Sequence, residues 1–175
     1  MTASEVFESV TGSGSSDFAT VVRILDNHGP WCLIGGLAVN CYVEPVFTLD
    51  ADLVVVSAQL DGIRSELIAA GFSLQDLPQS LIATMEGSEL RIQFSYEPRY
   101  QEFLKDTQRM KVLGEEVPVA SLVNITQGKI WAWTDKQRRP TKRKKDELDL
   151  MRMLEAYPGL RHAMPQEIKD QLPEA

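Results

Sequence analysis

Asp50 and Asp52 are the residues whose type and spacing most directly suggest chemistry in this sequence. They lie in the segment 48–56, where apolar residues alternate with polar ones as in a strand. Residues two apart on a strand point to the same face, so both carboxylates should project together while Ala51 and Leu53 enter the core. Adjacent carboxylates repel unless a cation joins them, and all-oxygen ligands suit a hard ion. The pair therefore predicts a site for Mg²⁺ or Mn²⁺.

A pair of glycines, Gly35-Gly36, precedes the two aspartates and follows a short apolar strand candidate, 31–34. Glycine lets a backbone approach a ligand closely, and the N-terminal N–H groups of the helix expected at 37–43 favour phosphate. A phosphate cradle followed by paired carboxylates is the arrangement that metal-assisted nucleotidyl transfer requires. The alternative interpretation is a structural turn followed by two aspartates on a solvated edge strand.

Positive charge is concentrated in one stretch, the basic segment (residues 136–145). It contains seven basic residues and no acid, whereas the whole chain carries a net charge of −7, so the remaining residues carry −14. The members are Lys136, Arg138, Arg139, Lys142, Arg143, Lys144 and Lys145. Such a segment could bind phosphate of a nucleotide, or an RNA or protein acceptor. The alternative is a solvated loop and helix start.

The elements that must position these residues follow from hydrophobic periodicity and turn signals. Helices are expected at 17–28, with Asp17 as N-cap, and at 37–43, 59–70, 121–134, 146–157 and 166–172. Strands are expected at 31–34 and 48–56 and in two hairpins, 81–96 and 110–119. This order predicts an α/β or α+β fold. Residues 1–16 are expected to be a flexible lead-in, and 17–175 a single domain whose C-terminal helices begin at about 121.

The glycine pair, thirteen intervening residues and Asp50-Ala51-Asp52 together resemble the motif of the nucleotidyltransferase fold, the superfamily of DNA polymerase beta. The segment 112–123, a following helix with Lys129, and the run 145–150 are similar to AbiEii-type toxin nucleotidyltransferases and their uncharacterised bacterial relatives. This resemblance spans about residues 18–155. It implies a mixed sheet flanked by helices, a nucleoside triphosphate bound with magnesium, and transfer of a nucleotidyl group to a hydroxyl. It also implies a toxin–antitoxin role with an antitoxin-like partner.

The resemblance assigns roles to individual residues. Gly35 and Gly36 would hold the triphosphate, and Asp50 and Asp52 would ligate the metal. The other residues it implies in nucleotide or acceptor binding are Lys129, Lys145, Asp146 and Asp149.

Two positions depart from the pattern of the relatives. Relatives often have an arginine four residues before the first aspartate, where this chain has Val46. Active relatives usually carry a third carboxylate on a later strand, where this chain has Gln93, which we expect to face Asp50 and Asp52. Glutamine can ligate a metal through its carbonyl oxygen but cannot act as a base. The alternative function is therefore a catalytically impaired nucleotide-binding or RNA-binding protein, unless an acid such as Glu89 or Glu97 reaches the site from a displaced strand register.

Length and composition exclude several other classes of protein. A chain of 175 residues has the size of one domain, and no stretch reaches the ~20 apolar residues that span a membrane. Two cysteines and two histidines are too few for a disulfide framework or a histidine-rich metal site. The N-terminus has no secretory pattern, so we expect a cytoplasmic protein without a membrane partner.

Overall fold

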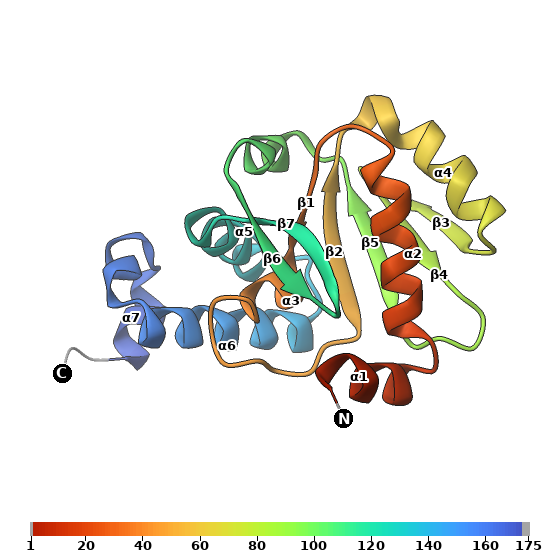
Figure 1. Ribbon diagram of the computed structural model, residues 1–175. Coiled ribbons are helices and arrows are strands. Elements are labelled where there is room, and N and C mark those ends of the chain that lie inside the picture. The colour runs from red at the N-terminus through yellow and green to blue at the C-terminus, as the bar shows by residue number, and fades with distance from the viewer. Residues whose placement is uncertain (1, 173–175) are drawn as a thin grey trace.

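A computed structural model describes residues 2–172, and across these residues the strands form one seven-stranded sheet (Figure 1). The strands are β1 (Trp31–Ile34), β2 (Asp50–Val55), β3 (Ser73–Leu77), β4 (Ser80–Thr84), β5 (Arg91–Ser95), β6 (Thr107–Val112) and β7 (Glu115–Ala120). The α-helices are α1 (Ala3–Thr11), α2 (Gly14–Asp26), α3 (Gly35–Val39), α4 (Leu60–Ala69), α5 (Leu122–Thr134), α6 (Pro140–Ala156) and α7 (Gln166–Gln171). The 3-10 segments are η1 (Ser57–Gln59), η2 (Pro98–Lys105) and η3 (Pro158–Ala163). The predicted α/β fold class is confirmed.

The sheet is mixed, with the strand order β3-β4-β5-β2-β1-β7-β6. Strand β1 pairs antiparallel with β2 and parallel with β7, and β2 pairs parallel with β5. Both predicted hairpins are confirmed, as β4–β5 and β6–β7. The hairpin strand β3 was not predicted, because its side chains are mostly exposed and it lacks the apolar alternation that marks a half-buried strand.

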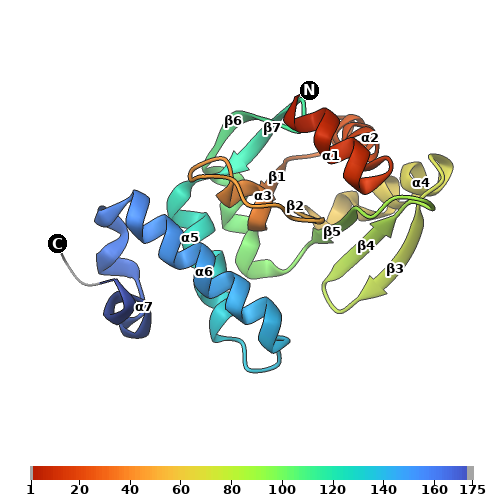
Figure 2. The same cartoon turned by 90° about the horizontal axis from the view of Figure 1, so that it is seen from below.

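Helices cover both faces of the sheet. Figure 2 shows α2 and α4 on one side, and α5 and α6 on the other. Helix α2 packs through Phe18, Val21 and Leu25, which recur at helical spacing and are almost fully buried. The strands contribute the alternate residues that face this helix, such as Ala51 and Leu53. Their neighbours on the opposite face of β2 are therefore free to serve a site between the sheet and α5–α6.

The N-terminal region differs from the expected lead-in. Residues 3–11 form helix α1, with a capping box between Thr2 and Glu5 at its start. Helix α2 begins at Gly14 after Ser13, so Asp17 is not its N-cap but lies in its first turn, where it accepts a hydrogen bond from the Ser13 hydroxyl. Burial of Phe7 in the core anchors α1 to the rest of the fold.

The basic segment is also more helical than expected. Helix α6 begins at Pro140, not at residue 146. Proline suits the first helical position because its fixed φ matches the helix and its missing N–H would lack a partner there. The second half of the basic segment therefore projects from the first turns of a rigid helix.

Candidate active site

Asp50 and Asp52 project from β2 towards α5 and α6, as their two-residue spacing predicts. Both are half-buried, whereas Ala51 and Leu53 between and after them are buried. Asp50 forms an ion pair with the ammonium of Lys142, and a guanidinium nitrogen of Arg91 lies 3.8 Å from its other oxygen. Asp50 is therefore neutralised by side chains of the protein itself.

Asp52 has different surroundings. No hydrogen bond or ion pair from any residue between 2 and 172 reaches its carboxylate, which faces a hollow of the surface. Burial raises the pKa of the Asp52 carboxyl, and nearby Asp50 adds to this effect against the opposing influence of Lys129. A carboxylate with free oxygens beside a neutralised one is suited to bind a cation or to accept a proton.

The two glycines at the start of α3 have separate structural reasons. Gly35 has a φ of 70°, and a Cβ at this position would collide with the Asp52 carboxylate. Glycine at 35 is therefore what lets Asp52 lie against the backbone. At Gly36, in contrast, a Cβ would lie 3.6 Å from the Thr48 hydroxyl, which is ordinary contact. The fold does not require glycine at 36, and this residue lines a hollow.

Lys129, Asp146 and Asp149 form a buried network between α5 and α6. The Lys129 ammonium lies 3.0 Å from Asp146 Oδ1 and 2.7 Å from Asp149 Oδ2. Arg138 pairs with Asp146, and Arg152 lies 2.7 Å from Asp149. Burial alone would lower the pKa of Lys129, but Asp149 and Asp146 outweigh it and raise that pKa. All three residues were expected to bind nucleotide or acceptor, and here they are paired with one another.

Two adjoining hollows meet at Asp52. The first, which we call the basic hollow, has a volume of about 180 Å³ and lies beside α3 and α6. Its polar lining comprises Thr48, Asp50, Asp52, Lys129, Arg138, Lys142, Lys145, Asp146, Asp149 and Arg152, with Gly36 and Asn40 on the α3 side. Exposed Phe47 and Leu148 form part of its rim.

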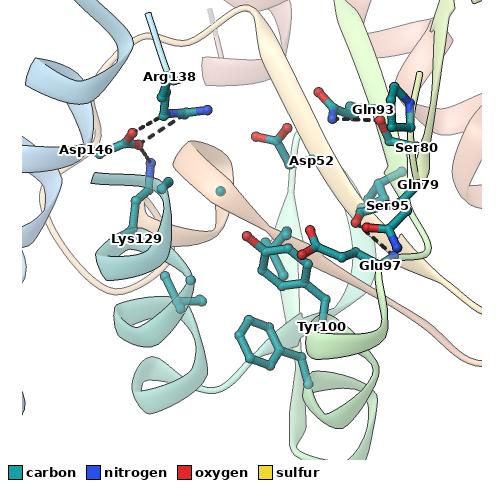
Figure 3. A pocket seen from close by; sticks show the side chains of 18 residues that line it. Asp52, Gln79, Ser80, Gln93, Ser95, Glu97, Tyr100, Lys129, Arg138 and Asp146 are labelled. Carbon is teal, nitrogen blue, oxygen red and sulfur yellow. Dashed lines mark hydrogen bonds and ion pairs between the residues drawn. The ribbon is translucent and has the colours of Figure 1, made fainter. Parts of the chain in front are cut away.

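The second hollow, which we call the Tyr100 hollow, has a volume of about 200 Å³ and lies between the ends of β4 and β5 and helix α5. Figure 3 shows Asp52 between Lys129, Arg138 and Asp146 on one side and the polar residues of β4, β5 and the segment after β5 on the other. These polar residues are Gln79, Ser80, Gln93, Ser95 and Glu97, with Tyr100 closing the hollow from η2. Every site residue named from the sequence lines one of the two hollows.

Gln93 lies directly beside Asp52 in the β2–β5 register and shares its face of the sheet. Its amide nitrogen donates a hydrogen bond to the Ser80 hydroxyl at 3.2 Å. The carbonyl oxygen of Gln93 is therefore the atom that is available to ligate a cation. Within residues 2–172 no three His, Cys, Asp or Glu side chains are grouped to hold a metal. The oxygen set of Asp50, Asp52 and Gln93 fits a hard divalent cation in kind, with one charge fewer than three acids would give.

Several residues of the two hollows were not singled out from the sequence. Lys142 and Arg138 were expected only as members of the basic segment, and their inward direction depends on where α6 begins. Glu97, in contrast, was named from the sequence as an acid that could stand in for the missing third carboxylate, and it lines the Tyr100 hollow because it continues the face of Gln93 and Ser95 by the period of two. A short helix or irregular segment is expected from the sequence at 100–107, and the structure has the 3-10 segment η2 at Pro98–Lys105, but nothing in the sequence indicates that Tyr100 closes a hollow.

Neither a protein-family model nor a curated protein matches this sequence. Solved structures do share its fold. The antibiotic-resistance factor ANT(2'')-Ia, in complex with adenylyl-2''-tobramycin, aligns over 91% of this chain and 98% of its own, with a TM-score of 0.58 and 15% identity. The lincosamide antibiotic adenylyltransferase LnuA, bound to lincomycin, aligns over 79% and 96%, with a TM-score of 0.55 and 9% identity. An antigenic nucleotidyltransferase-like protein from Paracoccidioides brasiliensis aligns over 93% and 87%, with a TM-score of 0.57 and 18% identity.

These likenesses show that the chain has the nucleotidyltransferase fold, as the glycine–aspartate motif predicts. The resemblance to AbiEii-type toxins is narrower and stays a prediction. Among the described residues, no helix has both the length and the apolar character that crossing a membrane requires.

Proposed function

We propose that this protein transfers a nucleotidyl group from a metal-bound nucleoside triphosphate to a hydroxyl of a small molecule. The observation that carries the proposal is the position of Asp52, which lines both the basic hollow and the Tyr100 hollow, with Asp50 beside it in the basic hollow. Two reactants held in the two hollows would therefore meet at the carboxylates. The fold is shared with two adenylyltransferases of small antibiotics, which supports this reaction class.

The basic hollow suits the phosphates of the donor. Lys142, Lys145 and Arg138 line it, and the Gly36 backbone borders it without a side chain. Cationic groups in a partly enclosed hollow hold a triphosphate by charge and by donated hydrogen bonds. Its apolar rim at Phe47 offers a surface on which a nucleobase could stack.

Asp50, Asp52 and the Gln93 carbonyl are the residues that would hold Mg²⁺ or Mn²⁺. When bound, the cation supplies charge neutralisation at the attacked phosphorus. The contribution of the protein is geometric, because β2 and β5 fix the three side chains side by side. Gly35 allows Asp52 to keep this position against the α3 backbone.

The Tyr100 hollow suits the acceptor. Its volume of about 200 Å³ is small even for a ligand pocket, and this favours a small molecule over RNA or protein. Ser80, Ser95 and Gln79 offer hydrogen bonds to hydroxyl groups. Glu97, which pairs with Arg99, is an acid on the far side of this hollow from Asp146 and could accept the proton when the acceptor oxygen bonds to the α-phosphorus and pyrophosphate leaves.

The test is a transfer assay with each of the four α-³²P-labelled nucleoside triphosphates, with Mg²⁺ or Mn²⁺ and a fractionated cell extract. We expect label in the small-molecule fraction, and loss of this label in Asp50→Asn and Asp52→Asn. Separate RNA and protein fractions serve as competing acceptors. Label that enters RNA or protein alone would contradict the proposed acceptor class, and label that persists in both variants would contradict the proposed site.

A second candidate function is triphosphate binding without transfer. It is favoured by Gln93, which stands beside Asp52 where active relatives usually have an acid, and by the lack of a three-acid group in the described part of the chain. The test is Gln93→Asp beside the wild type. Transfer that appears only in the variant would support the binding function, whereas robust wild-type transfer that the variant does not improve would exclude it.

The toxin role that the resemblance implies is a finer proposal. A nucleotidyltransferase toxin would arrest growth when its expression is induced in a bacterial host, and Asp52→Asn would relieve the arrest. Normal growth with wild-type protein at matched expression would contradict the toxin role but not the transfer reaction.

A further inference from the structure

The ion pair between Lys142 and Asp50 joins α6 to β2 across the mouth of the basic hollow. The lysine side chain is 28% exposed and the aspartate side chain 25% exposed, so the pair lies at the surface of the site and not in the core. Asp52, two residues along the same face, has no such partner among residues 2–172. The two carboxylates are therefore not equally available to a cation.

The backbone that carries Lys142 is fixed. Helix α6 is held against the end of α5 by a hydrogen bond of 3.0 Å from Arg143 Nε to the Trp133 carbonyl. Arg138 pairs with buried Asp146 just before the helix begins. The flexible part is the four-carbon stem of Lys142 itself, whose ammonium can turn between partners within its reach.

A divalent cation at Asp50 and the ammonium of Lys142 would compete for the same carboxylate. Two cations on one carboxylate repel each other, so a free metal ion must displace the lysine without offering it a new partner. A triphosphate in the basic hollow changes this balance, because Lys142 lines that hollow and phosphate oxygens would accept its hydrogen bonds.

We propose that Lys142 selects the metal–triphosphate complex over the free metal ion by occupying Asp50 until phosphate draws its ammonium away. This inference rests on the proposed function and adds an order of binding to it. Lys142 is in this sense a specificity-determining residue of the site. The free protein should bind Mn²⁺ weakly, and metal and triphosphate should bind together.

The test measures Mn²⁺ binding by the electron paramagnetic resonance signal of free Mn²⁺, with MnCl₂ alone and then with Mn²⁺ plus ATP. We expect Lys142→Met to bind Mn²⁺ alone at least tenfold more tightly than the wild type. The matched control is Lys144→Met on the same helix, because Lys144 pairs with Glu147 and lines neither hollow. Its Mn²⁺ affinity should stay within twofold of the wild type, and so should that of Lys142→Arg, which keeps the charge.

The double variant Lys142→Met/Asp50→Asn should lose the gain, because the released carboxylate is then absent. Unchanged Mn²⁺ affinity in Lys142→Met, with circular dichroism showing a folded protein, would overturn the inference even if Mn²⁺ and ATP bind together. A gain that survives Asp50→Asn would also overturn it. Absence of any joint binding of Mn²⁺ and each nucleoside triphosphate in the wild type would overturn the proposed function as well.

Discussion

Asp50 and Asp52 share one face of β2, yet their surroundings differ in charge and in burial. Asp50 has a lysine and an arginine as neighbours, whereas Asp52 keeps free oxygens and a pKa that burial raises. A raised carboxyl pKa means that the carboxyl group is harder to ionise in the folded protein than in the unfolded chain. Ionised Asp52 therefore costs the fold stability that a ligand could restore.

Asp52→Asn should raise the free energy of unfolding at pH 7, because the variant removes the cost of an ionised carboxylate in this partly buried position. The cost of ionised Asp52 is absent below pH ~4, where the carboxyl is protonated in the folded and unfolded chain alike. It grows as pH rises from there to the raised folded pKa, and it is complete above that pKa. The gain should therefore vanish in acid, which urea unfolding at pH 7 and pH 3.5 would show.

Asp50→Asn is the control for this prediction, since it removes the carboxylate partner of Lys142 and should give no gain. A loss of stability at pH 7 in Asp52→Asn equal to that in Asp50→Asn would contradict the asymmetry between the two residues.

Alanine at the two glycines should separate fold from binding. Gly35→Ala forces a side chain into a positive φ and against Asp52, so we expect a loss of about 1–3 kcal/mol in the free energy of unfolding. Gly36→Ala meets only ordinary contact in a helix and should keep or slightly raise stability. Its triphosphate affinity should nevertheless fall at least tenfold, as calorimetric titration would measure. Full affinity in Gly36→Ala would show that phosphate does not approach this backbone.

At the scale of elements, α5 and α6 are joined by charge in their interior. Asp146 is 1% exposed and accepts hydrogen bonds from both Lys129 and Arg138. A buried ion pair is a weak source of stability when complete, but removal of one partner leaves an uncompensated charge. The way in which α5 and α6 pack beside the site therefore depends on this network staying complete.

Asp146→Asn should lower the free energy of unfolding by about 1–3 kcal/mol, because Arg138 loses its carboxylate and Lys129 keeps only Asp149. Guanidinium unfolding would measure the loss. The matched surface variant is Glu102→Gln, whose pair with Lys105 is 73% and 71% exposed and is expected to contribute less than about 1 kcal/mol. Equal losses in the two variants would contradict the role of the network.

Elements with strong periodicity were predictable from the sequence, and elements fixed by tertiary contacts were not. The apolar run of β1 and the alternation of β2 appear where expected, and Ser121 caps α5 as predicted. The start of α6 was misplaced because its first turns carry basic residues and present almost no apolar stripe. Helix α1 was missed because a glycine- and serine-rich run follows it, which usually marks disorder.

The candidate site divides in the same way. The spacing of Asp50, Asp52 and Gln93 on strands was enough to place them together, since strand period and pairing leave little freedom. The sequence could not show that Lys129 would be paired with Asp146 and Asp149, because that pairing depends on how two helices pack. The inward turn of Lys142 has the same origin.

At the scale of the whole molecule, some side chains of the basic segment line the basic hollow and others face the solvent. Lys142 and Lys145 line the basic hollow, whereas Lys136 and Lys144 are exposed and line neither hollow. The remaining chain is acidic, so an extended polyanion would meet repulsion beyond this segment. This distribution favours a compact anion held in the hollow over a polynucleotide laid across the surface.

Two double variants with the same loss of charge test this distribution. Lys142→Gln/Lys145→Gln should lower triphosphate affinity at least tenfold, and Lys136→Gln/Lys144→Gln should change it less than twofold. Titration with labelled triphosphate at about 50 and 200 mM salt would measure both, since neutralised phosphates make affinity salt-dependent. Strong RNA binding that only the outward variant weakens, with a flatter salt dependence, would instead indicate a polynucleotide acceptor on the outer surface.

The position of β1 has a consequence for how the protein is made. One side of β1 pairs with β2, but its other side pairs with β7, and Leu33 finds its partner at Val119. Until β7 leaves the ribosome, a nascent chain exposes the backbone groups of an apolar strand that belongs in the middle of the sheet (Figure 1). Such open edges attract other chains. Synthesis that is interrupted before β7 should therefore yield fragments that aggregate. A chaperone that binds unfolded chains should associate with the nascent chain until β7 has been made and can pair with β1.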